Sequence, residues 1–134
     1  MTNPYDSHPP MMPSDTRTVL LVEDEPDLRN LLALVLADAG YVVTTAATGA
    51  AALTILATTP YALVLTDYHL PDMTGKAVAQ AAHQCVPPPM VLLMSGSPEI
   101  ARYARTVGAD AWFQKGDPLT TLLSLIRHLL GDRP

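Results

Sequence analysis

Five short apolar runs alternate with five segments of helical character, and this alternation constrains the fold more than any other feature of the sequence. The runs are TVLLV (18–22), YVVTTA (41–46), ALVLT (62–66), MVLLM (90–94) and DAWF (110–113). Most are apolar throughout rather than at every second residue, which is typical of strands buried on both faces. Strands that alternate with helices predict an α/β domain with a five-stranded parallel sheet, right-handed crossovers and helices on both faces.

The segments between these runs carry the signals of helices. In the first segment, apolar residues recur with the spacing of one helix face, at Leu28, Leu31, Leu32, Val35, Leu36 and Ala39. Pro26 suits the first turn of this helix and Gly40 suits its end. Asp117 and Pro118 similarly predict the N-cap and the first turn of the last helix. We therefore expect helices over residues 26–39, 49–58, 76–84, 98–107 and 118–130.

The length of 134 residues and the hydrophobic fraction of 49% indicate one packed domain. We place this domain at residues 17–131. Four prolines stand among polar residues in the first 16 positions, so residues 1–16 are expected to form a disordered, proline-rich tail. Residues 132–134 form a short C-terminal tail. Because the chain stops directly after the last helix, we expect a stand-alone domain that acts through protein contacts.

The composition excludes several classes of function. A net charge of −5 with only 8 Lys and Arg argues against a nucleic-acid-binding surface. No apolar stretch approaches the roughly 20 residues that span a bilayer, and the first residues lack the basic start and apolar centre of a secretory signal. The single cysteine, Cys85, cannot form an internal disulfide, which suits a reducing compartment. We expect a cytoplasmic protein that binds neither membranes nor nucleic acid directly.

Polar residues follow four of the five predicted strands. Ligands of open parallel sheets bind beyond the carboxyl ends of the strands, so the residues at those ends are the candidates for a site. These residues are Glu23 and Asp24 after the first strand, Asp67 after the third, Ser95 after the fourth and Lys115 after the fifth. The second strand ends in alanines and contributes nothing of this kind. The sequence thus predicts one cluster of three carboxylates, a hydroxyl and a lysine.

Such a cluster suits phosphoryl chemistry. Three neighbouring carboxylates repel one another, and Mg²⁺, which prefers oxygen ligands, relieves that repulsion and also neutralises a phosphoryl group. Asp67 is then a plausible nucleophile that forms an aspartyl phosphate. Lys115 would pair with the incoming charge, and Ser95 would donate a hydrogen bond to a phosphoryl oxygen.

In this arrangement the chain resembles the receiver domain of two-component response regulators, in the stand-alone form of the chemotaxis regulators. Four motifs carry the resemblance in order: Glu23-Asp24, Asp67 followed by LPDMTG, Ser95-Gly96, and GADAWFQK ending in Lys115. The resemblance covers residues 17–131. It implies a flavodoxin-like (βα)5 fold with the strand order 2-1-3-4-5.

The resemblance also implies a role for each site residue. Asp67 would accept the phosphoryl group from a phosphohistidine on a sensor histidine kinase or a histidine phosphotransfer protein. Asp24 would bind Mg²⁺ directly and Glu23 mainly through water, and the backbone carbonyl of His69 would complete the protein ligands. The chain would be no enzyme beyond phosphorylating itself from phosphodonors and removing that phosphoryl group again.

Switching would follow phosphorylation. The resemblance implies that Ser95 moves to the phosphoryl group while the aromatic residue Trp112 turns inward, altering the surface of the fourth helix, fifth strand and fifth helix. That surface would bind a downstream protein or a second copy of the chain. One departure concerns the residue after Lys115, which the family usually keeps as proline. Gly116 stands there instead, so we expect a differently shaped loop.

Other functions fit the residues less well. A phosphatase with an aspartyl nucleophile would need a second acid where His69 stands, and a serine hydrolase would need G-x-S-x-G around Ser95. A flavodoxin-like cofactor site would need a phosphate loop where the acidic EDEPD follows the first strand. Two alternatives stay open: a binding module of the same fold that signals without phosphorylation, and a receiver domain cut from a longer regulator or hybrid kinase.

Overall fold

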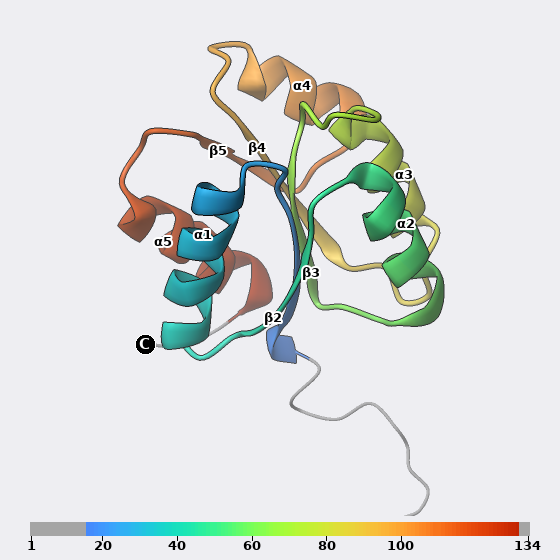
Figure 1. Cartoon of the computed structure of the whole chain (residues 1–134), viewed down its shortest axis with the longest axis horizontal. Coiled ribbons are helices and arrows are strands. Elements are labelled where there is room, and N and C mark those ends of the chain that lie inside the picture. Colours follow the sequence, from blue (N-terminus) through green and yellow to red (C-terminus); the bar gives the residue numbers. More distant parts are fainter. Residues whose placement is uncertain (1–15, 132–134) are drawn as a thin grey trace, which may run out of the picture.

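The structure, a computed structural model, describes residues 16–131 and consists of five strands and five helices in strict alternation (Figure 1). The strands are β1 (Thr18–Val22), β2 (Val42–Ala46), β3 (Leu63–Asp67), β4 (Met90–Ser95) and β5 (Ala111–Gln114). The helices are α1 (Pro26–Asp38), α2 (Gly49–Thr58), α3 (Gly75–His83), α4 (Ile100–Val107) and α5 (Leu119–Leu130).

All strands are parallel and lie in the order β2-β1-β3-β4-β5. The order reverses between β1 and β3, which are neighbours in the sheet. Their register places Val22 opposite Thr66, so the residues that follow each strand emerge side by side. The predicted fold class and strand order are confirmed.

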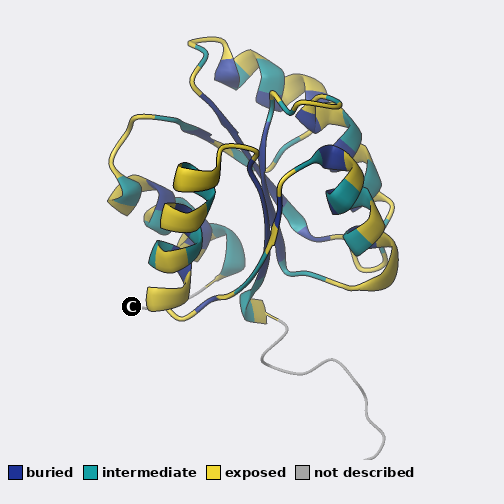
Figure 2. Ribbon diagram, in the orientation of Figure 1, coloured by how far each residue is buried: buried dark blue, intermediate teal, exposed yellow. Residues whose placement is uncertain are grey.

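The sheet separates two hydrophobic cores, and helices cover both of its faces (Figures 1 and 2). Alternate residues of each strand enter opposite cores because side chains alternate across a strand. Leu20 and Val22 of β1 lie in the core beneath α2, α3 and α4, whereas Val19 and Leu21 lie in the core beneath α1 and α5. The five residues of β3 are all buried, as expected for the central strand.

The ends of several elements differ from the sequence prediction. β3 and β4 each run one residue further than predicted, because the Tyr68 amide still donates to the Met94 carbonyl at 2.8 Å. Helix α4 begins at Ile100 rather than Pro98, since the chain first turns after β4. Pro118, not Asp117, is the N-cap of α5, and its carbonyl accepts the amide of Thr121. Asp67 and Ser95 therefore end their strands instead of following them.

The predicted tails fall almost entirely outside the described residues. Residues 1–15 and 132–134 are not described, so the tail predicted for residues 1–16 is represented here only by Thr16. Within residues 16–131, no helix combines the length and apolar character needed to cross a membrane.

Candidate functional site

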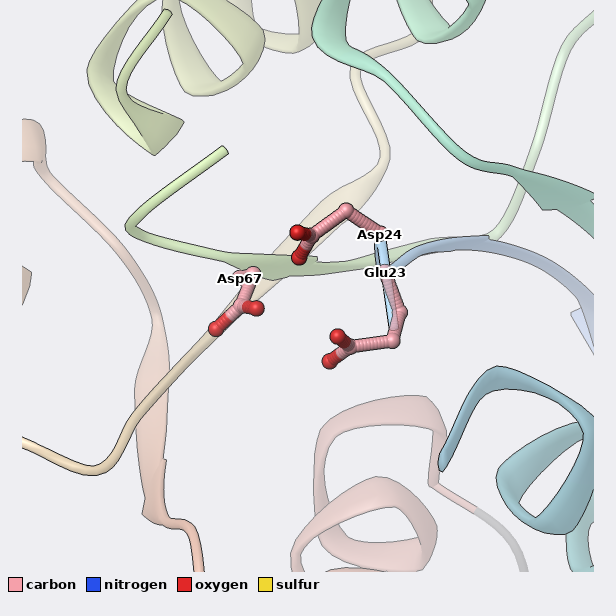
Figure 3. A group of neighbouring side chains, drawn as sticks. All are labelled: Glu23, Asp24 and Asp67. Atoms are coloured by element: carbon pink, nitrogen blue, oxygen red, sulfur yellow. The ribbon is translucent and has the colours of Figure 1, made fainter. Parts of the chain in front are cut away.

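Three carboxylates meet at the carboxyl ends of β1 and β3 (Figure 3). Glu23 and Asp24 directly follow β1, and Asp67 is the last residue of β3. One carboxylate oxygen from each lies within 4.8 Å of the others. Glu23 is fully buried and Asp67 is 4% exposed, whereas Asp24 faces solvent. Two buried acids and one exposed acid thus surround a space that opens to water.

Lys115, which directly follows β5, reaches across to this cluster. Its Nζ atom donates to Asp67 Oδ2 at 2.6 Å and lies 2.9 Å from Glu23 Oε1. Its backbone amide donates to the carbonyl of Ser95 at 2.9 Å, which fixes the start of the side chain beside β4. One lysine therefore serves two buried carboxylates, and the cluster keeps a net negative charge.

The ionisation of Asp67 reflects this balance. Burial of the carboxylate is the main cause that raises the pKa of Asp67 from 3.8 to about 7, and the charge of Glu23 adds to it. The Lys115 ammonium opposes the rise without cancelling it. For Lys115, burial acts to lower the pKa, but its contacts with Asp67 and Glu23 outweigh burial and raise it. A further positive charge at the site would favour the ionised form of Asp67.

The cluster fits a hard divalent cation. Its donors are carboxylate oxygens, the ligands that Mg²⁺ prefers. Glu23 Oε1 is buried, and its one cationic neighbour, the Lys115 ammonium at 2.9 Å, is shared with Asp67. One ammonium cannot neutralise three carboxylates, so a further cation would offset the remaining negative charge. Glu23, Asp24 and Asp67 could therefore hold Mg²⁺.

Local sequence fixes the two acids after β1. Glu25 caps α1 by accepting the Leu28 amide at 2.7 Å, and Pro26 occupies the first turn as predicted. Oε2 of Glu23 accepts the Glu25 amide at 3.0 Å, which orients the buried carboxylate. Arg29 donates to the backbone carbonyls of Glu23 and Asp24 at 3.1 and 3.3 Å. In the turn between β1 and α1, side chains thus bind both backbone amides and backbone carbonyls.

The loop from Tyr68 to Thr74 closes tightly after Asp67. The Gly75 amide donates to the Tyr68 carbonyl at 2.6 Å, and His69 forms a β-bridge with Thr74. A Cβ atom on Gly75 would lie only 2.8 Å from the Asp67 carbonyl oxygen, so the loop can turn this sharply only with glycine there. His69, whose carbonyl was predicted as a cation ligand, lies in this loop with its side chain exposed.

Asp72 ties the same loop to the next helix. Its two carboxylate oxygens accept the Gly49 and Ala50 amides, each at 2.9 Å, at the start of α2. These backbone hydrogen bonds lower the pKa of Asp72 below its ordinary value. Sequence analysis gave Asp72 no role, because its partners lie more than 20 residues away and helix caps are recognised mainly by their immediate neighbours.

Ser95 and Trp112, the two residues predicted to move on phosphorylation, differ in burial. Ser95 is buried at the end of β4, and its Oγ atom accepts the Ser97 amide at 3.0 Å. The side chain of Trp112 is 44% exposed and lines a groove of about 530 Å³ between α4, β5 and α5. The structure thus has Trp112 on the outside, and the inward position predicted for switching stays a prediction.

The loop after Lys115 is shaped by glycine. Gly116 has φ +101°, a conformation that residues with side chains rarely adopt. Among residues 16–131 the only cis peptide bond precedes Pro87, so the bond from Lys115 to Gly116 is trans. Gly116 thus has a positive φ where the family usually has proline, and Lys115 still reaches both carboxylates.

Five parallel strands in this order, with an acidic cluster at their carboxyl edge, define a CheY-like signalling domain of the flavodoxin type. The comparison with protein families makes this specific. The family described as response regulator receiver domain matches residues 19–127, and the chain belongs to that family.

Relatives and solved structures agree with this assignment. The chain is 35% identical to the response regulator receiver protein CpdR of Brucella abortus over 85 residues, which are 63% of this chain and 71% of CpdR. It is 33% identical to the transcriptional regulatory protein KdpE of Mycobacterium tuberculosis over 110 residues, 81% of this chain but only 49% of KdpE.

Among solved structures, the chemotaxis response regulator CheY4 of Vibrio cholerae has a TM-score of 0.75 at 30% identity, covering 84% of this chain and 97% of CheY4. The response regulator TrrA of Thermotoga maritima, solved in complex with Mg²⁺-BeF, has a TM-score of 0.77 at 26% identity, covering 84% of this chain and 98% of TrrA.

Proposed function

We propose that this chain accepts a phosphoryl group on Asp67, from a phosphohistidine of a sensor histidine kinase or a histidine phosphotransfer protein, with Mg²⁺ as cofactor. One observation carries the proposal: a buried Asp67 at the end of the central strand lies within 4.8 Å of two further carboxylates and 2.6 Å from Lys115. The receiver-family membership and the Mg²⁺-BeF complex of TrrA support it.

The chemistry follows from the residues present. A carboxylate oxygen of Asp67 attacks phosphorus, the bond from phosphorus to the donor imidazole breaks, and that nitrogen keeps the electron pair. When bound, Mg²⁺ would neutralise charge on the transferring phosphoryl oxygens and on the carboxylates. Lys115 is already within hydrogen-bond reach of Asp67 and can follow the negative charge onto the phosphoryl group. Ser95 supplies a hydroxyl from β4.

We assign the ligands as expected from the resemblance: Asp24 and Asp67 directly, Glu23 chiefly through water, and the backbone carbonyl of His69. The burial of Glu23 and its contact with Lys115 favour an indirect role for this residue. The chain's own catalysis would be limited to taking a phosphoryl group from a donor and losing it to water.

The output would be a change of protein contacts. The groove between α4, β5 and α5, with Trp112 at its surface, is where we expect a downstream protein or a second copy to bind. Trp112 would move inward as Ser95 approaches the phosphoryl group. We place the protein in the cytoplasm, because its single cysteine suits a reducing compartment.

Mass spectrometry tests the proposal directly. The intact chain is incubated with Mg²⁺ and acetyl phosphate, and we expect one phosphoryl group that hydroxylamine removes, as it does acyl phosphates. Asp67→Asn should abolish the gain, whereas the matched Asp38→Asn on the exposed end of α1 should retain it. A folded sample that binds Mg²⁺ but gains no phosphoryl group from any donor would overturn the proposal and favour a phosphorylation-independent binding module.

A further inference from the structure

An aromatic cluster joins the loop after Asp67 to helix α4. The rings of Tyr68 and Tyr103 are stacked, with centroids 4.2 Å apart and planes 3° from parallel. His69 meets both rings edge-on, at 5.0 Å from Tyr68 and 5.8 Å from Tyr103. The guanidinium of Arg102 lies 5.4 Å from the centroid of the Tyr103 ring. Two of the three rings thus belong to the residues that directly follow Asp67.

The backbone of Tyr68 is held in place by two hydrogen bonds. Its amide donates to the Met94 carbonyl at 2.8 Å and its carbonyl accepts the Gly75 amide at 2.6 Å, so the backbone is held from both directions. These two hydrogen bonds fix the backbone of Tyr68, whereas neither the amide nor the carbonyl of His69 has a backbone hydrogen bond within residues 16–131.

Helix α4 has fewer constraints of its own. It is 8 residues long, it has no side-chain hydrogen bond at its N-cap, and its buried residues are Ile100, Ala104 and Val107. Tyr103 is half-buried and packs against the core beneath α2, α3 and α4. The stack on Tyr68 adds to the packing of these buried residues a direct contact between α4 and the loop after Asp67.

We propose that Tyr103 is a positioning residue for the acidic site. By stacking on Tyr68 and meeting the His69 ring in a T-shaped contact, it holds His69 in the conformation that presents its carbonyl to the cation. This inference rests on the proposed function, because it assumes that the carbonyl is a ligand. A contact that holds a loop in its binding conformation before the ligand arrives raises affinity by reducing the ordering that binding requires.

The coupling must work in both directions. If the position of α4 affects cation and phosphoryl-mimic binding, then ligand binding at the site must affect α4 by the same free energy. The aromatic cluster provides a direct side-chain link between them that does not involve Ser95 or Trp112. Trp112 lies in the groove between α4 and α5, on the outer surface.

Calorimetric titration of Mg²⁺, and then of beryllofluoride in saturating Mg²⁺, tests the inference. Tyr103→Leu removes the stack, Tyr103→Phe keeps it, and Tyr61→Leu is a matched control in the same core that lies outside the aromatic cluster. We expect Tyr103→Leu to weaken both affinities about two- to tenfold, the range that one aromatic pair can supply. Tyr103→Phe and Tyr61→Leu should bind like the wild type.

The thermal midpoint, measured on the same samples, separates positioning from stability. Tyr61→Leu should lower the midpoint without weakening Mg²⁺, and equal Mg²⁺ affinity in Tyr103→Leu and wild type would overturn the inference. If the wild type itself binds no Mg²⁺, the proposed function fails instead. Ring resonances of Tyr103 in the wild-type protein need no destabilising variant: we expect them to shift on Mg²⁺ addition, and unchanged resonances at saturating Mg²⁺ would overturn the coupling.

Discussion

Asp67→Asn should stabilise the Mg²⁺-free protein at alkaline pH, although it removes the partner of a 2.6 Å ion pair. Two carboxylates, Asp67 and Glu23, share the single ammonium of Lys115, so one negative charge is buried without compensation. An asparagine of nearly the same shape removes that charge and leaves Glu23 and Lys115 paired. Removing one member of an ion pair is destabilising when it strands the other, and here no charge is stranded.

The magnitude follows from the pKa of Asp67, which is about 7 in the folded protein against an ordinary value of 3.8. Between these values the folded state holds a proton that the unfolded state has lost, so stability falls as pH rises and the loss is complete above pH 7. Linkage gives the wild type about 2 kcal/mol more stability at pH 5.5 than at pH 8 from this group alone. At pH 8 the variant should exceed the wild type by about 2–4 kcal/mol.

Urea unfolding in EDTA at pH 5.5 and pH 8 measures the difference. From pH 5.5 to pH 8, the free energy of unfolding of the wild type should fall by about 2 kcal/mol relative to that of Asp67→Asn. The free energy of unfolding of Asp38→Asn should change with pH as the wild-type value does. Saturating Mg²⁺ should weaken the pH dependence of the wild-type free energy of unfolding, because a cation favours the ionised carboxylate. Parallel curves for wild type and Asp67→Asn in EDTA would refute the reasoning, since Asp67 would then carry no excess proton when folded.

Three further predictions concern the surroundings of Asp67. Lys115→Met leaves two buried carboxylates without a cation, so we expect urea unfolding in EDTA to show a loss of about 2–3 kcal/mol, partly restored by Mg²⁺; an equal loss with and without Mg²⁺ would count against a shared cation site. Asp72→Asn should lower the free energy of unfolding at pH 7 and speed amide exchange at Gly49 and Ala50. Because the pKa of Asp72 is lowered on folding, its contribution to stability is present above about pH 4 and is lost as the pH falls further. The free energies of unfolding of wild type and variant should therefore converge in acid. Gly116→Ala should reduce stability by about 1 kcal/mol through its positive φ alone, since a Cβ there contacts nothing within 4 Å; unchanged urea unfolding would show that the loop relaxes.

Sequence patterns predicted the site because the sheet forces its parts together. Once the runs ending at Asp67 and Lys115 are recognised as parallel strands, both residues must emerge at the same edge. The strand order and the acidic cluster are accordingly confirmed. The exact ends of the strands were harder to predict. β3 and β4 extend by hydrogen bonds that depend on the neighbouring strand, such as the one from the Tyr68 amide to the Met94 carbonyl.

Contacts between side chains distant in sequence could not be predicted in the same way. Nothing in the local sequence pairs Asp72 with Gly49, or Tyr68 with Tyr103. Both contacts depend on how the loop after Asp67 packs between α2 and α4, which a periodic pattern does not specify. The burial of Glu23 was equally hidden, because an acidic run beside a helix start is usually exposed.

The site residues are widely separated in the sequence, so the site forms only in the folded domain. Lys115 reaches Asp67 across 48 residues of sequence, and Asp67 in turn stands 44 residues after Glu23, so no local fragment contains the cluster. Contacts of such separation form only when most of the domain has been assembled. A chain cut before Lys115, or one in which the sheet is incomplete, does not assemble the cluster. Under the proposed function such a chain would not be phosphorylated, so only the fully folded domain would respond.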